Sequence, residues 1–578
     1  MFLHFPSSFF TLFIAILISG SDSEELDPII ETNYGKLQGF TIDLENNEKA
    51  DIFLNIPFAK PPVGELRFEK PQPLEPWTAI REAKSYGSAC VPQFLSKGGF
   101  GMADDISEDC LTLNVYRPNK KSASKNGYPV LVWVYGGGFG VGSAAQTGYI
   151  NVTNNFIPQD IIVVVIQYRL GPLGWISTGD SALPGNLGYW DMTASLKFIH
   201  ENIKHFGGNP EKVTVWGESA GSVAASGLTL SPHSRGYVSQ SVEMSGSVFA
   251  TWGSNEAIIE VTKDLSMLLN CDKEDSTTVK TCWKTKSVDE ILEAVLKISP
   301  NGKGMNIVKF QPRVDGDFFP EDYVELVKKA PQKPAMIGFT DVESALFTLI
   351  IEQSLPEFYV PYNKFQEFGS LNLTQFIRET VAPESLFRDK AKEVQEKLID
   401  FYETREKPQD ADYKFYLDRY TQIFTDNGFT IPALLTAKKK MENKWPVYLY
   451  QNEHYNKNSL PENFPVKGSM HAMEYTYLHG LSFSNIPFDE DDKKFQKVLI
   501  QTVANFVKTG NPSLSSLEWP KLTKEHPLRY LSLKAEPEVK EPLLKEKFDF
   551  WTGLSKNYSY DIVRGMFVKK EKTGKEEL

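Results

Sequence analysis

The feature that most constrains this chain is a series of short, uninterrupted apolar runs separated by helical patterns. The runs cover residues 130–134, 161–166, 213–216, 335–339 and 447–450. Because their apolar residues are continuous rather than alternating, they are typical of strands buried on both faces. Helical candidates cover residues 190–203 and 495–506. Strands that alternate with helices predict an α/β fold, in which helices flank a central, mostly parallel sheet.

The length of 578 residues would allow several domains. However, no internal repeat, heptad array or long low-complexity tract divides the chain. Stretches rich in proline or glycine, at 57–64 and 183–188, are interpreted as loops rather than boundaries. We therefore expect a single large domain over residues 21–568. A net charge of -12 argues against a nucleic-acid partner, because no basic stripe is present to neutralise phosphates.

Both ends of the chain carry targeting patterns. An apolar run at 9–18, followed by small residues, predicts a cleaved secretory signal over residues 1–20. The run is too short to span about 30 Å of hydrocarbon, and no later stretch reaches that length, so no membrane span is expected. The charged tail, 569–578, ends in Lys-Glu-Glu-Leu, one conservative change from the Lys-Asp-Glu-Leu address. This ending predicts a retention receptor as a partner and residence in the lumen of the endoplasmic reticulum, with secretion as the alternative.

Cysteines and sequons fit the same compartment. Four cysteines allow three connectivities, and proximity in the sequence favours two disulfides, between Cys90 and Cys110 and between Cys271 and Cys282. Three sequons predict glycosylation, at Asn151, Asn372 and Asn557.

A serine in a Gly-x-Ser-x-Gly pattern is the first candidate for chemistry. The pattern Gly217-Glu218-Ser219-Ala220-Gly221 directly follows the apolar run at 213–216 and precedes a helix-compatible segment. A strand, this pentapeptide and a helix together are typical of a nucleophile elbow, which presents the serine hydroxyl to a substrate. The pentapeptide alone is only suggestive, since a chance match in a chain of this length is not rare.

A glycine triplet supplies candidate donors for an oxyanion. Acyl transfer develops negative charge on a carbonyl oxygen, so backbone amides must already point at it. Gly136-Gly137-Gly138 follows the run at 130–134, and the amides of Gly137 and Gly138 could approach such an oxygen. The amide of Ala220, after the serine, is the third candidate. The alternative is a flexible surface turn.

A nucleophilic serine also needs a base, and that base needs an acid to orient it. In this architecture the chain order is serine, then acid, then histidine. The residues alone do not choose among four downstream histidines, which are His454, His471, His479 and His526.

Several motifs together resemble the type-B carboxylesterase family, which includes cholinesterases, animal carboxylesterases and the non-catalytic neuroligins. These motifs lie at 56–59, 62–68, 107–111, 206–210 and 217–221, and the resemblance covers nearly the whole mature chain. It implies an α/β-hydrolase fold, a gorge leading to the serine and the same two disulfides. It implies neither a metal nor an organic cofactor.

The resemblance also implies which residues complete the site. It places the acid at Glu343, with Asp341 as a local rival, and the base at His471. The chain departs from the family pattern at Ser344 and Ala472, where glycine is usual, and at Asn209, where aspartate is common. Ser219 would attack an ester carbonyl while His471 takes its proton and Glu343 holds the imidazole.

The predicted substrate is a small ester with a short or medium acyl group and a neutral alcohol. Cholinesterases carry a tryptophan in the first disulfide loop that stacks on quaternary ammonium. Here the only aromatics between Cys90 and Cys110 are Phe94 and Phe100, so a choline site is not expected. Trp252 and Glu218 are weaker candidates for the substrate pocket. The rival hypotheses are a neuroligin-like binding protein, a lipase and a cholinesterase-type specificity, and the sequence leaves the oligomeric state open.

Overall fold

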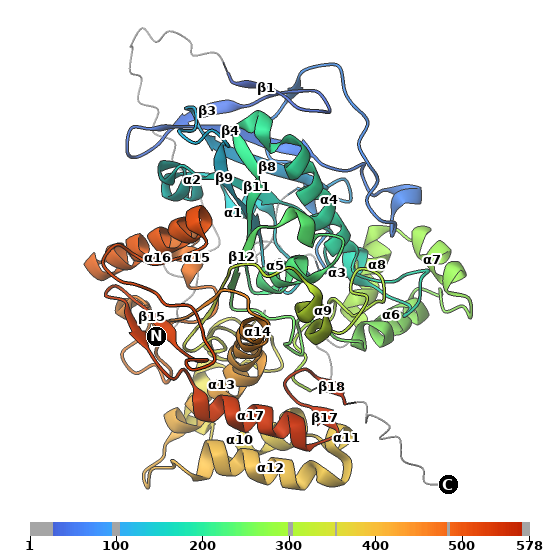
Figure 1. Cartoon of the computed structure of the whole chain (residues 1–578). Coiled ribbons are helices and arrows are strands. Elements are labelled where there is room, and N and C mark those ends of the chain that lie inside the picture. Colours follow the sequence, from blue (N-terminus) through green and yellow to red (C-terminus); the bar gives the residue numbers. More distant parts are fainter. Residues whose placement is uncertain (1–26, 95–104, 299–303, 353–354, 482–485, 569–578) are drawn as a thin grey trace, which may run out of the picture.

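A computed structural model describes residues 27–568, apart from residues 95–104, 299–303, 353–354 and 482–485 (Figure 1). The predicted signal at 1–20 and the predicted tail at 569–578 lie outside the described residues and remain predictions. Within the described ranges, the structure contains no helix whose length and apolarity would allow it to cross a bilayer.

All five predicted apolar runs form strands of one large sheet. They are β9 (Tyr128–Val134), β10 (Ile162–Ile166), β11 (Gly208–Glu218), β13 (Ala335–Thr340) and β14 (Val447–Asn452). Neighbouring members pair in parallel, as in β9 with β10 and β13 with β14. Both β10 and β13 are buried along their full length. The predicted α/β architecture with a parallel core is therefore confirmed.

The sheet has eleven strands in the order β16-β15-β14-β13-β12-β11-β9-β10-β8-β4-β3. The sequence prediction missed one central strand, β12 (Gln240–Met244), because its polar residues interrupt the apolar run. It also missed the antiparallel strands at the two edges. These are β3 (Phe40–Asp43), β4 (Lys49–Pro57) and β8 (Thr112–Pro118) at one edge and β16 (Glu538–Lys540), beside β15 (Tyr530–Leu533), at the other.

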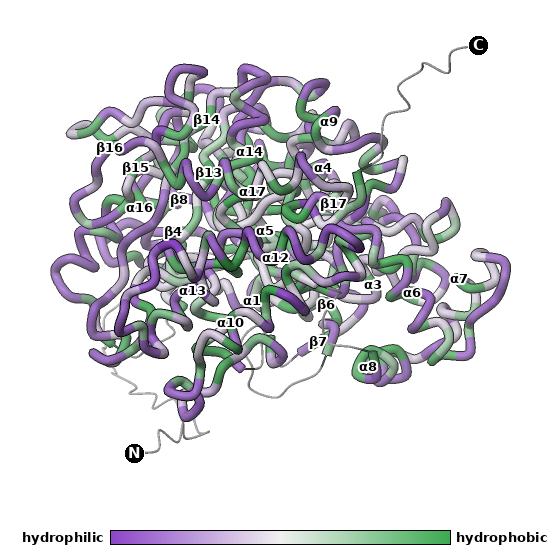
Figure 2. Tube along the Cα trace, turned by 90° about the horizontal axis from the view of Figure 1, so that it is seen from below, coloured by the Kyte–Doolittle hydropathy of each residue, from purple (hydrophilic) through white to green (hydrophobic). Residues whose placement is uncertain are grey.

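The two predicted helices are present as α4 (Leu187–Asn202) and α16 (Glu490–Thr509). The side chain of Asp489 caps the first turn of α16 through the amide of Asp492, and Gly510 ends the helix in a left-handed conformation. A third helix, α5 (Ala220–Leu230), follows β11 and is buried along its whole length. The tube in Figure 2 is largely hydrophilic along the outer loops, so the apolar residues lie mainly inside.

A second group of helices lies at the lower side of Figure 1. It includes α10 (Ser370–Phe376), α12 (Ala391–Ile399), α13 (Tyr413–Thr425) and α17 (Lys545–Asn557). A π-helical turn, Asp426–Thr430, joins α13 to α14 (Ile431–Glu442), and every residue of that turn is buried. This connection brings the helical group against the sheet near the strand ends that carry the candidate site.

Both predicted disulfides are present. One joins Cys90 to Cys110 and the other joins Cys271 to Cys282. The first closes the loop that follows β6 (Ala89–Cys90), which pairs with β7 (Ile106–Ser107). A closed loop restricts the unfolded chain, so each bridge favours the folded state. The predicted glycosylation sites Asn151, Asn372 and Asn557 are all exposed, which leaves them open to modification.

Candidate active site

Ser219 lies on a sharp turn between β11 and α5, as expected for a nucleophile elbow. Its backbone has φ 58° and ψ -126°, a conformation that is strained for a residue with a side chain. The amide of Ser219 donates to Met244 O at 2.8 Å, which ties the turn to β12. A Cβ atom at Gly221 would lie 2.0 Å from Val134 O, so only glycine lets α5 pack this closely on β9. Ser219 itself is half-buried.

The glycine triplet lies directly beside this serine. A Cβ atom at Gly136 would lie 3.0 Å from the Cβ of Ser219. Gly137 and Gly138 have φ values of 104° and 58°, which turn the chain sharply away from β9. Their backbone is not buried, and the amide of Ala220 begins the first turn of α5. The glycine triplet and the first turn of α5 therefore both adjoin Ser219, and the amides of Gly137, Gly138 and Ala220 remain the candidate oxyanion donors.

Glu343 and His471 meet on two loops that follow neighbouring strands. Oε2 of Glu343 lies 2.6 Å from Nδ1 of His471, and the two side chains are 0% and 5% exposed. The amide of His471 also donates to Glu343 O at 3.2 Å, and the amide of Thr340 donates to Glu343 Oε1 at 2.8 Å. The carboxylate is thus fixed on one side by β13 and pairs with the imidazole on the other.

Asp341, the local rival for the acid, has a different role. Its Oδ1 accepts a hydrogen bond from the amide of Ser469 at 2.7 Å. The hydroxyl of Ser469 in turn accepts from Asn452 Nδ2 at 2.9 Å. Burial raises the pKa of Asp341 to about 7. These contacts join the loop after β13 to the loop after β14, and so they support the Glu343–His471 pair without touching the imidazole.

The other candidate histidines lie in different surroundings. His454 Nε2 contacts Asp492 Oδ1 at 2.9 Å, and the half-buried His526 contacts Glu541 at 2.9 Å. His479 is buried against Trp216, and burial lowers its pKa to about 3. Among the described residues, His471 is the only histidine that pairs with Glu343.

The structure places Glu218 against the candidate base. Oε1 of Glu218 lies 3.1 Å from Nε2 of His471, and the Glu218 side chain is 2% exposed. No hydrogen bond joins the Ser219 hydroxyl to His471 in this arrangement of the described residues. Such catalytic hydrogen bonds often form only once a substrate is bound.

Electrostatics in this pocket favour a charged imidazole. Burial by itself disfavours the charge, but the carboxylates of Glu218 and Glu343 outweigh it and raise the pKa of His471 to about 9. Burial raises the pKa of Glu218 to about 7, although the neighbouring imidazole opposes this shift. Burial also raises the pKa of Glu474 to about 8. The imidazole of His471 and the carboxyl of Glu474 are therefore largely protonated at neutral pH.

Aromatic rings form an apolar wall against the imidazole. The ring of Phe347 lies 5.0 Å from that of His471, and the ring of Phe429 lies 4.8 Å from it. Both phenylalanines are presented by π-helical turns, Leu346–Ile350 and Asp426–Thr430, and such turns are frequent at functional sites. Sequence reasoning missed both, because no motif marks a turn of this kind.

Trp252 supports this wall from behind. The side chain is 1% exposed, and its ring lies 5.4 Å from that of Phe429. Its indole N–H donates to Gly428 O at 2.6 Å. Trp252 therefore fixes the turn that carries Phe429, and the phenylalanine is the ring that contacts His471.

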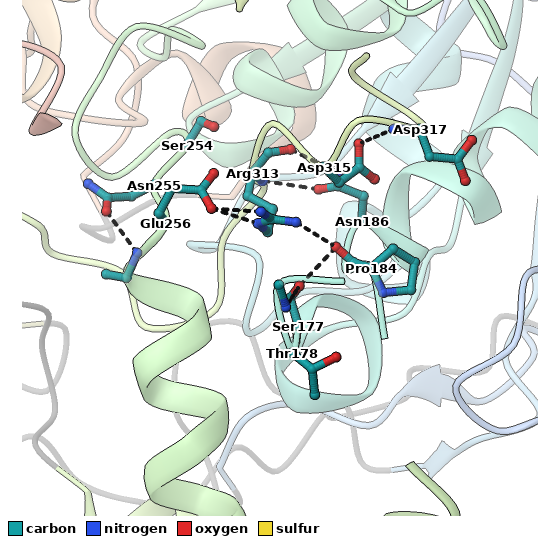
Figure 3. A network of polar contacts seen from close by, with 12 residues as sticks. Ser177, Thr178, Pro184, Asn186, Ser254, Asn255, Glu256, Arg313, Asp315 and Asp317 are labelled. Atoms are coloured by element: carbon teal, nitrogen blue, oxygen red, sulfur yellow. Dashed lines mark hydrogen bonds and ion pairs between the residues drawn. The ribbon is translucent and has the colours of Figure 1, made fainter. Parts of the chain in front are cut away.

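The polar network of Figure 3, around Arg313 and Asn186, holds a loop that also carries Val308. Val308 on that loop is the nearest side chain to a Cβ atom placed on Gly138, at 3.7 Å. Farther along the loop, Arg313 pairs with Glu256 at 2.8 Å and exchanges two hydrogen bonds with Asn186, at 2.9 and 3.1 Å. The network therefore anchors the loop that brings Val308 to the glycines, a contact that no sequence motif signalled.

Comparison with known proteins gives a consistent result. The model of the carboxylesterase family matches residues 26–551. Gut esterase 1 of Caenorhabditis briggsae is 35% identical over 94% of this chain and 95% of its own length. The acylcarnitine hydrolase of Mus musculus is 32% identical over 94% of each chain. The cocaine esterase of Homo sapiens is 31% identical over 93% of each chain.

Proposed function

Because the chain belongs to the carboxylesterase family and is a carboxylic ester hydrolase, we propose that it is a carboxylesterase that cleaves short or medium acyl esters through an acyl-enzyme on Ser219. The proposal is supported by the positions of the three residues, since Ser219 directly follows β11, Glu343 lies on the loop after β13 and His471 lies in the segment after β14. The observation that carries the proposal is the 2.6 Å contact between the buried Glu343 carboxylate and His471 Nδ1, beside the strained turn of Ser219.

In the proposed mechanism, the Ser219 oxygen attacks the ester carbonyl while Nε2 of His471 accepts the hydroxyl proton. Glu343 keeps Nδ1 protonated and stabilises the imidazolium that forms. The amides of Gly137, Gly138 and Ala220 bind the oxyanion of the tetrahedral intermediate. His471 then gives its proton to the departing alcohol, and water repeats these steps on the acyl-enzyme.

The resting contact with Glu218 adds one step. Nε2 of His471 lies 3.1 Å from Glu218 Oε1 without a hydrogen bond, and it must turn to the Ser219 hydroxyl to accept its proton. A bound ester would promote this exchange by placing its carbonyl between the serine and the three amides. To act as the base, the imidazole must first lose the proton on Nε2, and Glu218, whose pKa burial raises to about 7, can accept that proton.

Hydrolysis of 4-nitrophenyl butyrate tests the proposal. We expect turnover by the wild type, loss of turnover in Ser219→Ala, and an organophosphate label on the peptide that contains Ser219. Ser239→Ala is a matched control, because Ser239 directly precedes β12, at the end of that strand away from the Ser219 turn, and donates to Val213 O. Folded wild-type protein with neither turnover nor label would contradict the proposal and favour a neuroligin-like binding role.

The proposed preference for neutral alcohols rests on the surroundings of the site. The first disulfide loop has no tryptophan to stack on quaternary ammonium. Apart from the carboxylates of Glu218 and Glu343, the side chains beside the imidazole, Phe347 and Phe429, and the one beside Gly138, Val308, are apolar. Turnover of acetylcholine should be well below that of 3,3-dimethylbutyl acetate, its neutral analogue, and equal turnover would contradict this preference. A jump in activity above the critical micelle concentration of the substrate would favour a lipase instead.

We further propose that the protein resides in the lumen of the endoplasmic reticulum. Two disulfides fit an oxidising compartment, and the final Lys-Glu-Glu-Leu resembles a retention address. Deletion of residues 575–578 should release the enzyme into the culture medium. Unchanged retention of the truncated protein inside the cell would contradict this proposal.

A further inference from the structure

The orientation of the Gly138 amide depends on the carbonyl that precedes it. Gly137 O accepts two hydrogen bonds, from the amides of Gly140 at 3.0 Å and Val141 at 3.1 Å. The peptide bond between Gly137 and Gly138 is planar and trans, so its N–H points opposite to its carbonyl. Any shift of Gly140 therefore redirects the Gly138 N–H, one of the three proposed oxyanion donors.

Gly140 itself is held by a residue of the first disulfide loop. The amide of Gln93 donates to Gly140 O at 2.7 Å. The side-chain amide of Gln93 also packs on the α-carbon of Gly140. A Cβ atom at Gly140 would lie 2.3 Å from Cδ of Gln93 and within 2.7 Å of its two terminal atoms. Gln93 thus restrains Gly140 through both its backbone and its side chain.

The same glutamine packs against a second loop that supports the glycines. A Cβ atom at Gly171 would lie 2.9 Å from Cβ of Gln93. The amide of Gly171 donates to Phe139 O at 2.8 Å, so this loop also holds the turn after Gly138. Gln93 lies three residues after Cys90, whose disulfide to Cys110 anchors the loop. Its amide oxygen is buried and makes no hydrogen bond within the described structure.

A glutamine whose oxygen is buried without a hydrogen bond is costly, because that oxygen has given up its contact with water. Its contacts with Gly140 and Gly171 supply a reason to keep it. We propose that Gln93 is a positioning residue for the oxyanion hole, which aligns the Gly138 amide through Gly140. The inference rests on the proposed function, and it assigns to Gln93, near the start of the Cys90–Cys110 segment, the task of supporting the transition state.

Kinetics of Gln93→Ala with 4-nitrophenyl butyrate test the inference. A misaligned oxyanion donor weakens binding of the transition state more than of the ester, so kcat should fall about tenfold while KM stays within about twofold. The inhibition constant of an aryl trifluoromethyl ketone, which forms a tetrahedral adduct with an active serine, should rise about tenfold in parallel. Gln501→Ala, a partly buried glutamine that donates to Asn505 on α16, is the matched control and should leave both values unchanged.

A double variant separates positioning from general destabilisation. In Gly140→Ala the new methyl displaces the Gln93 amide, and we expect kcat to fall. In Gln93→Ala/Gly140→Ala the same methyl occupies the emptied space, so kcat should recover to within about threefold of the wild type. The thermal unfolding midpoint of each variant shows whether it is folded.

Two results would overturn the inference. One is Gln93→Ala with kcat and ketone affinity both within twofold of the wild type. The other is a double variant whose kcat loss equals the product of the two single losses. Either result can occur while the wild type is active and Ser219→Ala is inactive, which would leave the proposed function intact. An inactive wild type would instead refute the proposed function.

Discussion

Nε2 of His471 lies 3.1 Å from Oε1 of Glu218, the residue that precedes the proposed nucleophile. The opposite nitrogen, Nδ1, lies 2.6 Å from Glu343 Oε2. The imidazole therefore lies between two buried carboxylates, which together favour its charged form. The contact with Glu218 is one of charge, because Glu218 Oε1 makes no hydrogen bond within the described residues.

This contact predicts a pH dependence. Only the neutral imidazole can accept the Ser219 proton, so kcat/KM should rise with pH as His471, whose pKa is raised to about 9, loses its proton. Glu218→Gln removes a negative charge beside Nε2, so the pKa of His471 should fall. The acidic limb of the kcat/KM profile should then move down by about one pH unit or more. An acidic limb that stays in place, or moves to higher pH, would contradict this assignment.

The identity of the acid can be tested with two carboxamides. Glu343→Gln keeps the shape of the side chain but removes the charge that stabilises the imidazolium, and kcat should fall by about 10³-fold or more. Asp341→Asn should stay within about tenfold of the wild type, because its Oδ1 accepts from Ser469 rather than from His471. If the Asp341 variant lost more activity than the Glu343 variant, the two roles would have to be exchanged.

The support of the aromatic wall predicts a catalytic effect of a buried tryptophan. Trp252→Phe removes the donor to Gly428 O and frees the turn that carries Phe429, so kcat should fall about tenfold. Trp283→Phe is the matched control, since Trp283 is also buried and its indole donates to Ser266 at 2.9 Å. Each loss should lower the free energy of unfolding by about 1–3 kcal/mol. Only Trp252→Phe should lower kcat in the folded protein, and an equal loss in both would contradict a specific role.

A buried ion pair predicts a large effect on stability. Lys440 of α14 pairs with Glu243 of β12, and both side chains are fully buried. Lys440→Met leaves the Glu243 carboxylate without its partner and should lower the free energy of unfolding by about 3–5 kcal/mol. The double variant Lys440→Met/Glu243→Leu buries no charge, so much of this loss should be regained. Urea unfolding followed by tryptophan fluorescence measures both, and a double variant no more stable than the single one would refute the explanation.

The fold class could be read from the sequence because it depends on local patterns. Continuous apolar runs such as those of β9 and β10 indicate burial on both faces, and this held for all five predicted strands. The edge strands and β12 escaped prediction because polar residues interrupt their apolar runs. In β12 the charged Glu243 interrupts the apolar run, and only its pairing with Lys440 from a distant helix makes burial of that charge tolerable.

Motifs and family resemblance together marked Ser219, the glycine triplet, Glu343 and His471 as candidates, since a nucleophile, its donors and its base must occur in a set order. Their spacing could not show what else surrounds the imidazole. Glu343 and His471 are separated by 128 residues, and Trp252 and Gly428 by 176. Contacts over such separations depend on how the loops after parallel strands converge at one edge of the sheet.

By itself, the sequence determined the α/β architecture, the turn at Ser219 and the chemistry available to it, because backbone geometry and apolar periodicity act over a few residues. Only the tertiary structure decided that Glu218 contacts His471, that Phe429 stands between Trp252 and the imidazole, and that Gln93 packs under Gly140. These contacts arise from close packing between distant segments. Their energies depend on burial and distance, which are properties of the folded chain.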